Sequence, residues 1–216
     1  MIKAVLFDLD GTLADTLTDI ADSANYALTS NGYPAQQTED YKYFVGDGMT
    51  KLIERILPET DKNAETIEKI RGVWLAHYME HCLDNTRPYD GMVEALAALK
   101  KRGIKLGVVT NKHHETAEKV IYGLFGRDIY ECVYGFKDGV PRKPDPFLVF
   151  KSLAFIGAEP NECIYIGDSG VDIETAKNAG CISAGAAWGF RSEEELEEAG
   201  AGRILYSPAE IPGLCF

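Results

Sequence analysis

The feature that most constrains this fold is a regular alternation of strand-length and helix-length segments, which runs from Pro88 almost to residue 216. The apolar segments of strand length are residues 104–110, 130–136, 163–167, 181–187 and 203–206. The segments with helical periodicity, each closed by a glycine, are residues 91–102, 114–123, 146–156, 170–179 and 192–199. Strands that alternate with crossover helices form a mostly parallel sheet covered on both faces. The alternation therefore predicts a three-layer, Rossmann-like α/β fold.

One further strand stands apart from this alternation. Residues 2–7 form an apolar run that is too short to stand alone, so we assign it to the same sheet. The intervening residues 15–85 have helical periodicity, and we expect Trp74 and Tyr78 to lie inside this helical unit. The sequence thus predicts an α/β core of residues 1–14 and 86–216 with an all-helical insertion, residues 15–85.

The composition excludes several classes of partner. The net charge is −12, whereas proteins that bind nucleic acid or anionic membranes present a basic face. The five cysteines are odd in number and widely spaced, which is typical of reduced thiols in a cytosolic protein. The N-terminus becomes charged at Asp8, unlike a signal peptide, and no apolar run reaches the roughly 20 residues of a membrane span. We expect a cytoplasmic protein, monomeric or homodimeric, with no nucleic-acid or membrane partner.

Polar residues gather where the predicted strands end. The clusters are Asp8-Leu9-Asp10-Gly11-Thr12, Thr110-Asn111, Arg142-Lys143-Pro144-Asp145-Pro146 and Gly167-Asp168-Ser169-Gly170-Val171-Asp172. Open parallel sheets bind their ligands at the carboxyl ends of the strands. We therefore expect carboxylates, a lysine and small hydrogen-bonding side chains to meet at one edge of the sheet.

This set of side chains suits phosphoryl transfer. Clustered carboxylates repel one another unless a cation joins them, and hard oxygen ligands with open water positions select Mg²⁺. A carboxylate beside such an ion can attack phosphorus, while a lysine neutralises the nucleophile and the phosphoryl oxygens. A second carboxyl group can protonate the leaving oxygen and later deprotonate water.

The four clusters resemble the motifs of the haloacid dehalogenase superfamily of phosphohydrolases, in order and spacing, over essentially the whole chain. "DLDGT" matches the first motif, "VVTN" the second, the lysine of "RKPDP" the third and "GDSGVD" the fourth. The helical insertion is similar to the small helical cap of that superfamily. Within it, "FDLDGTLADT", "TNK" and "FVGDGMTKLIERIL" look most like phosphoglycolate phosphatases.

The resemblance implies a role for each acidic residue and for the lysine. Asp8 would be the nucleophile and a Mg²⁺ ligand. Asp10 would be the general acid/base, and its main-chain carbonyl would also touch the metal. Lys143 would balance charge, Asp168 would be a further metal ligand, and Asp172 would support the metal or Lys143 through hydrogen bonds.

Other residues would bind the phosphoryl group and shape the site. The resemblance implies that Thr110 and Asn111 hold the phosphoryl group. It also implies that Gly11, together with Thr12, shapes the turn that leads into the cap linker.

The cap offers one candidate for substrate recognition. Lys51 lies near the start of a predicted helix, residues 49–57, whose N-terminal amides can bind a carboxylate. Asp47 is placed to cap that helix, which would compete for the same amides. His113 and His114 are typical of an exposed helix start rather than of acid/base groups.

The predicted activity is Mg²⁺-dependent hydrolysis of a small phosphorylated metabolite through an aspartyl phosphate, with 2-phosphoglycolate as the expected substrate. A sugar-phosphate phosphatase or phosphomutase and an inorganic pyrophosphatase of the same superfamily stay open as alternatives. A signalling receiver phosphorylated on aspartate without turnover is the alternative from another class. Receivers are shorter and uncapped, and they carry the phospho-accepting aspartate on a middle strand.

Overall fold

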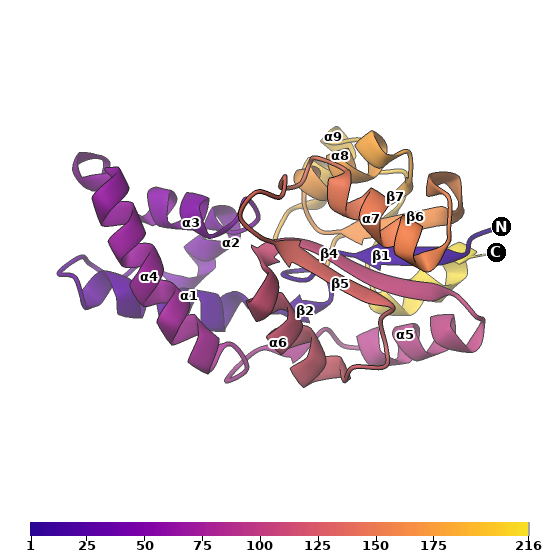
Figure 1. The fold of residues 1–216 in the computed structure, drawn as a ribbon, viewed down its shortest axis with the longest axis horizontal. Coiled ribbons are helices and arrows are strands. Elements are labelled where there is room, and N and C mark those ends of the chain that lie inside the picture. The colour runs from indigo at the N-terminus through magenta and orange to yellow at the C-terminus, as the bar shows by residue number, and fades with distance from the viewer. Residues whose placement is uncertain (216) are drawn as a thin grey trace.

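The computed structural model describes residues 1–215 and has the predicted α/β architecture (Figure 1). Within these residues a six-stranded sheet has the order β5-β4-β1-β6-β7-β8, and all its pairings are parallel. Its strands are β1 (Ala4–Phe7), β4 (Lys105–His113), β5 (Cys132–Phe136), β6 (Cys163–Gly167), β7 (Ile182–Ala186) and β8 (Ile204–Leu205). Strand β1 lies at the centre of the sheet, where both faces are covered, and this explains why its sequence is apolar throughout.

Helices cover both faces of the sheet. They are α5 (Met92–Lys101), α6 (His114–Phe125), α7 (Phe147–Ile156), α8 (Gly170–Ala179) and α9 (Glu193–Glu198), with the 3-10 segments η3 (Pro160–Glu162) and η4 (Pro208–Cys215). Helices α7 and α8 lie on one face, and α5 and α6 lie on the other. Because successive strand residues point to opposite faces, Leu6 packs into the α7–α8 side of the core and Phe7 into the other side.

The remaining helices lie together beyond one end of the sheet, while both termini lie at the other end (Figure 1). They are α1 (Leu17–Thr29), α2 (Tyr41–Phe44), α3 (Met49–Ile56) and α4 (Ala64–His81), with the 3-10 turns η1 (Thr38–Asp40) and η2 (Glu59–Asp61). Trp74 and Tyr78 are buried in α4, and the Trp74 indole donates to the Ile20 carbonyl over 3.3 Å. The division of the chain into a core and a cap at residues 15–85 stays a prediction.

Two linkers join these helices to the α/β part of the chain: the first runs between β1 and α1, and the second between α4 and α5. Strand β2 (Ala14–Asp15) pairs antiparallel with β3 (Arg87–Pro88), a ribbon that the sequence did not predict. Next to it, the buried carboxylate of Asp19 accepts hydrogen bonds from the backbone and side chains of Asn85 and Thr86, over 2.7–3.1 Å. Asp19 therefore fastens the first turn of α1 to the second linker.

Two local predictions need correction. Strand β4 continues to His113 instead of ending at residue 110. The prediction that Asp47 caps α3 is wrong, because Gly48 occupies the N-cap with φ +89° and Asp47 is ion-paired with Arg55 instead.

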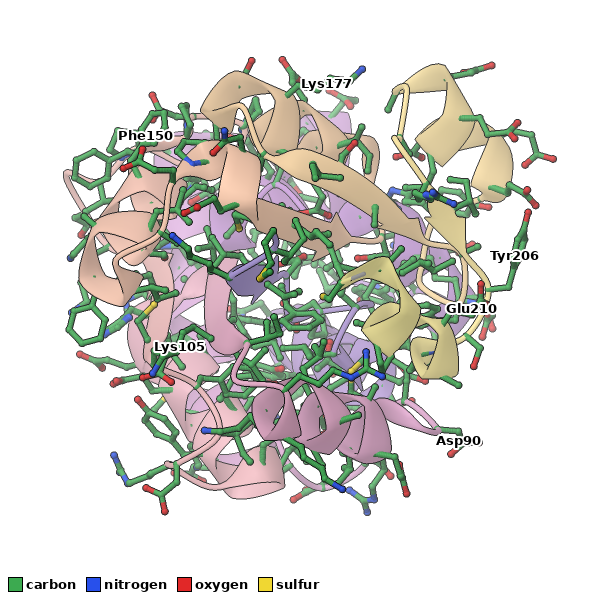
Figure 2. All side chains as sticks on the ribbon, turned by 90° about the vertical axis from the view of Figure 1, so that its right-hand side faces the viewer. Asp90, Lys105, Phe150, Lys177, Tyr206 and Glu210 are labelled. Carbon is green, nitrogen blue, oxygen red and sulfur yellow. The ribbon has the colours of Figure 1, made fainter. Side chains whose placement is uncertain are left out.

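The end of the molecule away from α1–α4 carries exposed charged side chains, among them Asp90, Lys105 and Lys177 (Figure 2). Of the helices that the structure describes, none combines the length and the apolar composition needed to cross a membrane.

Candidate active site

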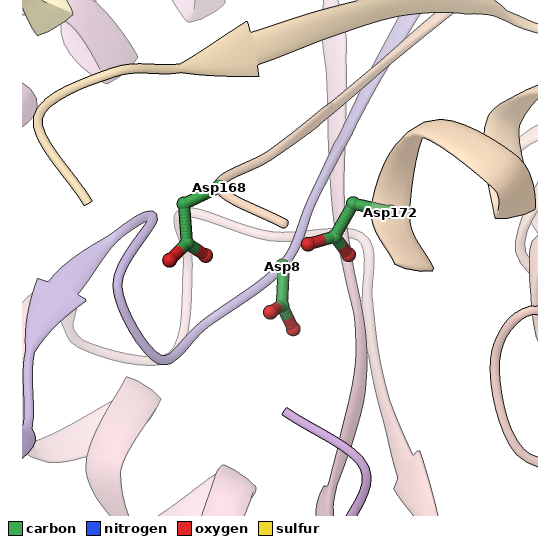
Figure 3. Close-up of side chains that lie close together, drawn as sticks. All are labelled: Asp8, Asp168 and Asp172. Carbon is green, nitrogen blue, oxygen red and sulfur yellow. The ribbon is translucent and has the colours of Figure 1, made fainter. Parts of the chain in front are cut away.

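Three buried carboxylates meet at the carboxyl ends of β1 and β6. Asp8 follows β1, Asp168 follows β6, and Asp172 lies in the first turn of α8 (Figure 3). One carboxylate oxygen from each lies within 4.8 Å of the others. The parallel register explains this meeting, because Phe7 pairs with Ile166 and the residues that follow both strands leave the sheet at the same edge.

A single lysine lies among these carboxylates. The Lys143 ammonium is 2.9 Å from Asp8 Oδ1 and 2.6 Å from Asp172 Oδ1. Burial lowers the pKa of Lys143, but Asp172 and Asp8 outweigh it and raise the pKa well above its ordinary value. Asp172 also accepts from the Ser169 amide and hydroxyl, which fixes the carboxylate that orients Lys143. Lys143 is therefore a permanent cation at the centre of the cluster.

The charges of this cluster do not balance. When all three carboxyl groups are ionised, they and the one ammonium leave two negative charges uncompensated. Burial raises the pKa of Asp8 to about 6, with Lys143 opposing the rise and Asp172 and Asp10 adding to it. Asp8 Oδ1 is buried and receives no aligned hydrogen bond, although Lys143 is close. The cluster offers hard oxygen ligands, an oxygen without an aligned hydrogen-bond donor and surplus negative charge. These three features together fit a divalent cation.

Asp168 is held in place from two sides. Its Oδ1 accepts from the Thr12 hydroxyl over 2.9 Å, and its Oδ2 accepts from the Phe190 amide over 2.9 Å. Gly11 has φ +82°, and a Cβ there would lie 2.2 Å from Asp168 Oδ2. Burial, then the charges of Asp172 and Asp8, raise the pKa of Asp168 well above its ordinary value, against those two hydrogen bonds.

Asp10 lies in a different environment from Asp8. Its Oδ1 accepts from the Lys112 ammonium and from the Thr16 hydroxyl, each over 2.7 Å. Lys112 is buried and lies 4.5 Å from the centre of the Tyr78 ring in α4. Sequence reasoning gave Lys112 no role, although "TNK" placed it directly after the second motif.

Thr110 and Asn111 lie beside the acidic cluster at the carboxyl end of β4. The Asn111 side chain is already bonded: it donates to the carbonyls of Gly46 and Lys143 and accepts from the Lys143 amide over 2.9 Å. It therefore joins β4 both to the loop of Lys143 and to the segment before α3. The Thr110 hydroxyl accepts from the Lys112 amide over 3.2 Å.

A small cavity separates this edge of the sheet from α1–α4. Its volume is about 60 Å³, and its lining includes Asp8, Asp10 and Thr110 from the sheet and Met49 and Trp74 from the helices. Lining residues that the sequence did not assign to the site include Lys112, His113, Phe190 and Arg191.

Lys51 does not line this cavity. It lies on the exposed side of α3, where its ammonium is 2.6 Å from Glu54. The structure therefore does not bring the predicted substrate lysine to the other site residues. The start of α3 does reach the cavity, but through Gly48 and Met49. His113 lines the cavity, contrary to the exposed position expected for it, and its Nδ1 is buried without a hydrogen-bond partner.

Comparisons of the sequence and of the fold with known proteins point to the same family. Residues 5–186 match the model of the haloacid dehalogenase-like hydrolase family. The phosphoglycolate phosphatase of Aquifex aeolicus is 34% identical, with 88% of this chain and 86% of that protein covered. The N-acetylmuramic acid 6-phosphate phosphatase of Pseudomonas aeruginosa is 34% identical, with 97% and 95% covered. A crystal structure from Lactobacillus delbrueckii subsp. bulgaricus, provisionally named a phosphoglycolate phosphatase, superposes with a TM-score of 0.93 at 29% identity, over 99% of this chain and 98% of that one.

Proposed function

Because the chain belongs to the family of haloacid dehalogenase-like hydrolases, we propose that the acidic cluster beside β1 and β6 is its active site. The chain is a phosphoric monoester hydrolase. The observation that carries the site assignment is the trio Asp8, Asp168 and Asp172 around the single ammonium of Lys143. Buried like charges destabilise a fold unless a bound group balances them. A divalent metal ion would balance these charges, and its positive charge would also offset that of the bound phosphoryl group.

In the first half-reaction, Asp8 is the nucleophile. One of its oxygens forms a bond to phosphorus while the bond between phosphorus and the leaving oxygen breaks. Asp10 gives its proton to that oxygen, and the alcohol departs. Lys143, 2.9 Å from Asp8 Oδ1, balances the charge of the nucleophile and of the transferred oxygens. Thr110 and Asn111 hold the phosphoryl oxygens, Asn111 through its main chain because its side chain is already bonded.

In the second half-reaction, the aspartyl phosphate is hydrolysed. Asp10, now ionised, takes a proton from water, the water oxygen bonds to phosphorus, and the bond to Asp8 breaks to release inorganic phosphate. Lys112 and Thr16 hold one oxygen of Asp10 in place for both proton transfers. Asp8, Asp168 and the main-chain carbonyl of Asp10 would hold Mg²⁺, which supplies positive charge beside the nucleophile.

We propose 2-phosphoglycolate as the substrate. The cavity has a volume of only about 60 Å³, which favours a compact substrate over a large one. The Aquifex aeolicus relative is named a phosphoglycolate phosphatase. N-acetylmuramic acid 6-phosphate is the second candidate, because the Pseudomonas aeruginosa relative matches over 97% of this chain. That larger substrate requires the helices α1–α4 to open further.

The test is a comparison of kcat/KM under one condition for 2-phosphoglycolate, N-acetylmuramic acid 6-phosphate, pyrophosphate, hexose phosphates and nucleoside monophosphates. We expect 2-phosphoglycolate to lead by at least about tenfold, and we expect a chelator to abolish every activity until Mg²⁺ is restored. A lead for another substrate would reject the substrate assignment but keep the phosphatase. Full activity after exhaustive chelation would reject the metal.

We also propose that residues 15–85 act as a cap that closes over the bound substrate. The cavity lies between α1–α4 and the sheet, so closure shields the aspartyl phosphate from bulk water and opening releases the product.

The five cysteines of the chain are free thiols, which is consistent with a cytoplasmic location.

A further inference from the structure

The loop that follows β7 touches both the acidic cluster and the helices α1–α4. In the acidic cluster, the Phe190 amide donates to Asp168 Oδ2 over 2.9 Å. Gly189 lies so close to the same residue that a Cβ there would be 2.2 Å from the Asp168 Cβ. The position of this loop and the position of Asp168 are therefore set together.

The next residue, Arg191, reaches α2. Its Nη1 donates to the Lys42 carbonyl, and its Nη2 donates to the Val45 carbonyl over 2.8 Å. These carbonyls belong to the last turn of α2 and to its C-cap, where a helix leaves acceptors unpaired. A planar guanidinium, which is always charged, can satisfy two such acceptors at once. Asn111, which donates to the Gly46 carbonyl, is a neutral neighbour of this contact.

Arg191 is also anchored on its own side of the cavity. Its Nε lies 3.5 Å from Glu195 Oε2, and Glu195 Oε1 accepts from the Gly170 amide over 3.1 Å. Gly170 begins α8, the helix whose first turn carries Asp172. The guanidinium thus connects α2 with two elements of the acidic cluster. One is the N-terminus of α8, through Glu195, and the other is the loop after β7 that contacts Asp168.

We propose that Arg191 is a positioning residue for the phosphatase reaction: it fastens α2 to the β7 loop, so that cap closure and the placement of Asp168 occur together. The inference rests on the proposed function for its catalytic consequence. The attachment of α2 to the β7 loop does not depend on that function, because it is carried by the hydrogen bonds of Phe190 and of Arg191 with Lys42 and Val45. Of the residues lining the cavity, Lys112 is the other with a long cationic side chain, and it is bound to Asp10.

Two variants test this role. Arg191→Met keeps an unbranched apolar stem but removes the charged donors, while Arg191→Lys keeps the charge but offers no planar fork. Arg191→Met removes hydrogen bonds that a charged group donates. Their loss predicts a roughly 10- to 100-fold smaller population of the closed state. Arg203→Met is the matched control, because Arg203 is exposed just before β8, away from the cavity.

The measurements are kcat/KM for 2-phosphoglycolate and for ethyl phosphate, Mg²⁺ affinity by calorimetry, and the radius of gyration by small-angle scattering. For Arg191→Met we expect kcat/KM to fall at least tenfold and equally for both substrates, Mg²⁺ affinity to fall several-fold and the particle to expand. We expect Arg191→Lys to recover part of each loss, and Arg203→Met to stay within twofold of the native protein.

Two results would overturn the proposal. A loss confined to 2-phosphoglycolate would mean that Arg191 binds the substrate carboxylate directly. An unchanged radius of gyration and unchanged Mg²⁺ affinity in a folded Arg191→Met protein, checked by circular dichroism, would mean that the contact fastens nothing. If the native protein hydrolysed none of these esters but Arg191→Met still expanded and lost Mg²⁺ affinity, the proposed function would fall while the fastening role would stand.

Discussion

Replacing Gly11 by alanine should disable the site by displacing Asp168. Gly11 has φ +82°, and an added Cβ would lie 2.2 Å from Asp168 Oδ2, where ordinary contact begins at 3.4 Å. The carboxylate must therefore retreat by about 1.2 Å, the difference between 3.4 Å and 2.2 Å. Thr12 and Phe190 hold both of its oxygens, so it cannot retreat without losing a hydrogen bond.

Two effects of different size follow from this substitution. A misplacement of about 1 Å costs on the order of 10²-fold in rate, so kcat/KM should fall by that much or more. The left-handed backbone costs a further 1–2 kcal/mol or so for a residue with a Cβ. For a chain of this size that cost lowers the melting temperature by roughly 2–8 °C. Mg²⁺ affinity should weaken as well, because Asp168 would be one of its ligands.

Gly32→Ala is the control that separates the two effects. Gly32 has φ +83°, nearly the same as Gly11, but no atom lies within 4 Å of an added Cβ. Gly32→Ala should therefore share the loss of melting temperature and keep its activity and Mg²⁺ affinity. Steady-state kinetics, calorimetry and thermal melts on the three proteins decide the matter. Activity in Gly11→Ala within threefold of Gly32→Ala would refute the argument that the glycine exists to admit Asp168.

Three further predictions concern the buried carboxylates. Asp8→Asn should abolish turnover without lowering the melting temperature of the metal-free protein, since the amide removes one of the mutually repelling charges; near-native activity would reject the covalent mechanism. The folded-state pKa values of Asp8, about 6, and of Asp168 are raised above their unfolded values. The metal-free protein should therefore lose stability as pH rises from about 4 through about 6, and melts that are flat over that range would contradict this. Asp19→Asn should cost on the order of 2–4 kcal/mol, because a buried carboxylate that accepts from Asn85 and Thr86 becomes an amide; urea denaturation measures the loss, and a cost below about 1 kcal/mol would count against it.

The order of the elements and the meeting of the motifs were predictable from local patterns. The segment around β6 is an example: a short apolar run predicts a strand, the small and acidic residues after it predict a loop, and the glycine-ended periodic stretch predicts a helix. Parallel register then brings Asp8 and Asp168 together without any knowledge of side-chain contacts. The fold class and the carboxyl-end location of the acidic cluster follow from such patterns.

Contacts between distant segments could not be predicted in this way. The sequence favours Lys51 as a substrate contact because it lies near a helix start, but the orientation of α3 turns its side chain toward Glu54 and solvent. The glycines on either side of Asp47 favour a helix cap at this position, yet Arg55 in α3 offers its carboxylate a charged partner. Arg191 follows β7 by several residues, after Trp188 and Phe190, and nothing in the local sequence indicates that α2 will present free carbonyls to it.

The two aspartates of the first motif lie two residues apart, yet the fold gives each its own lysine. Asp8 lies beside Lys143, which comes from the loop before α7, and Asp10 is bound by Lys112, which lies in β4. Separate partners let the two carboxyl groups take separate roles, because neither depends on the other's ammonium for its charge balance. Asp8 shares Lys143 with Asp172 and so keeps a need for further positive charge, as a nucleophile beside a metal must. Asp10 is instead held by Lys112 and by the Thr16 hydroxyl, which fixes the position of the carboxyl group that the proposed mechanism uses for both proton transfers.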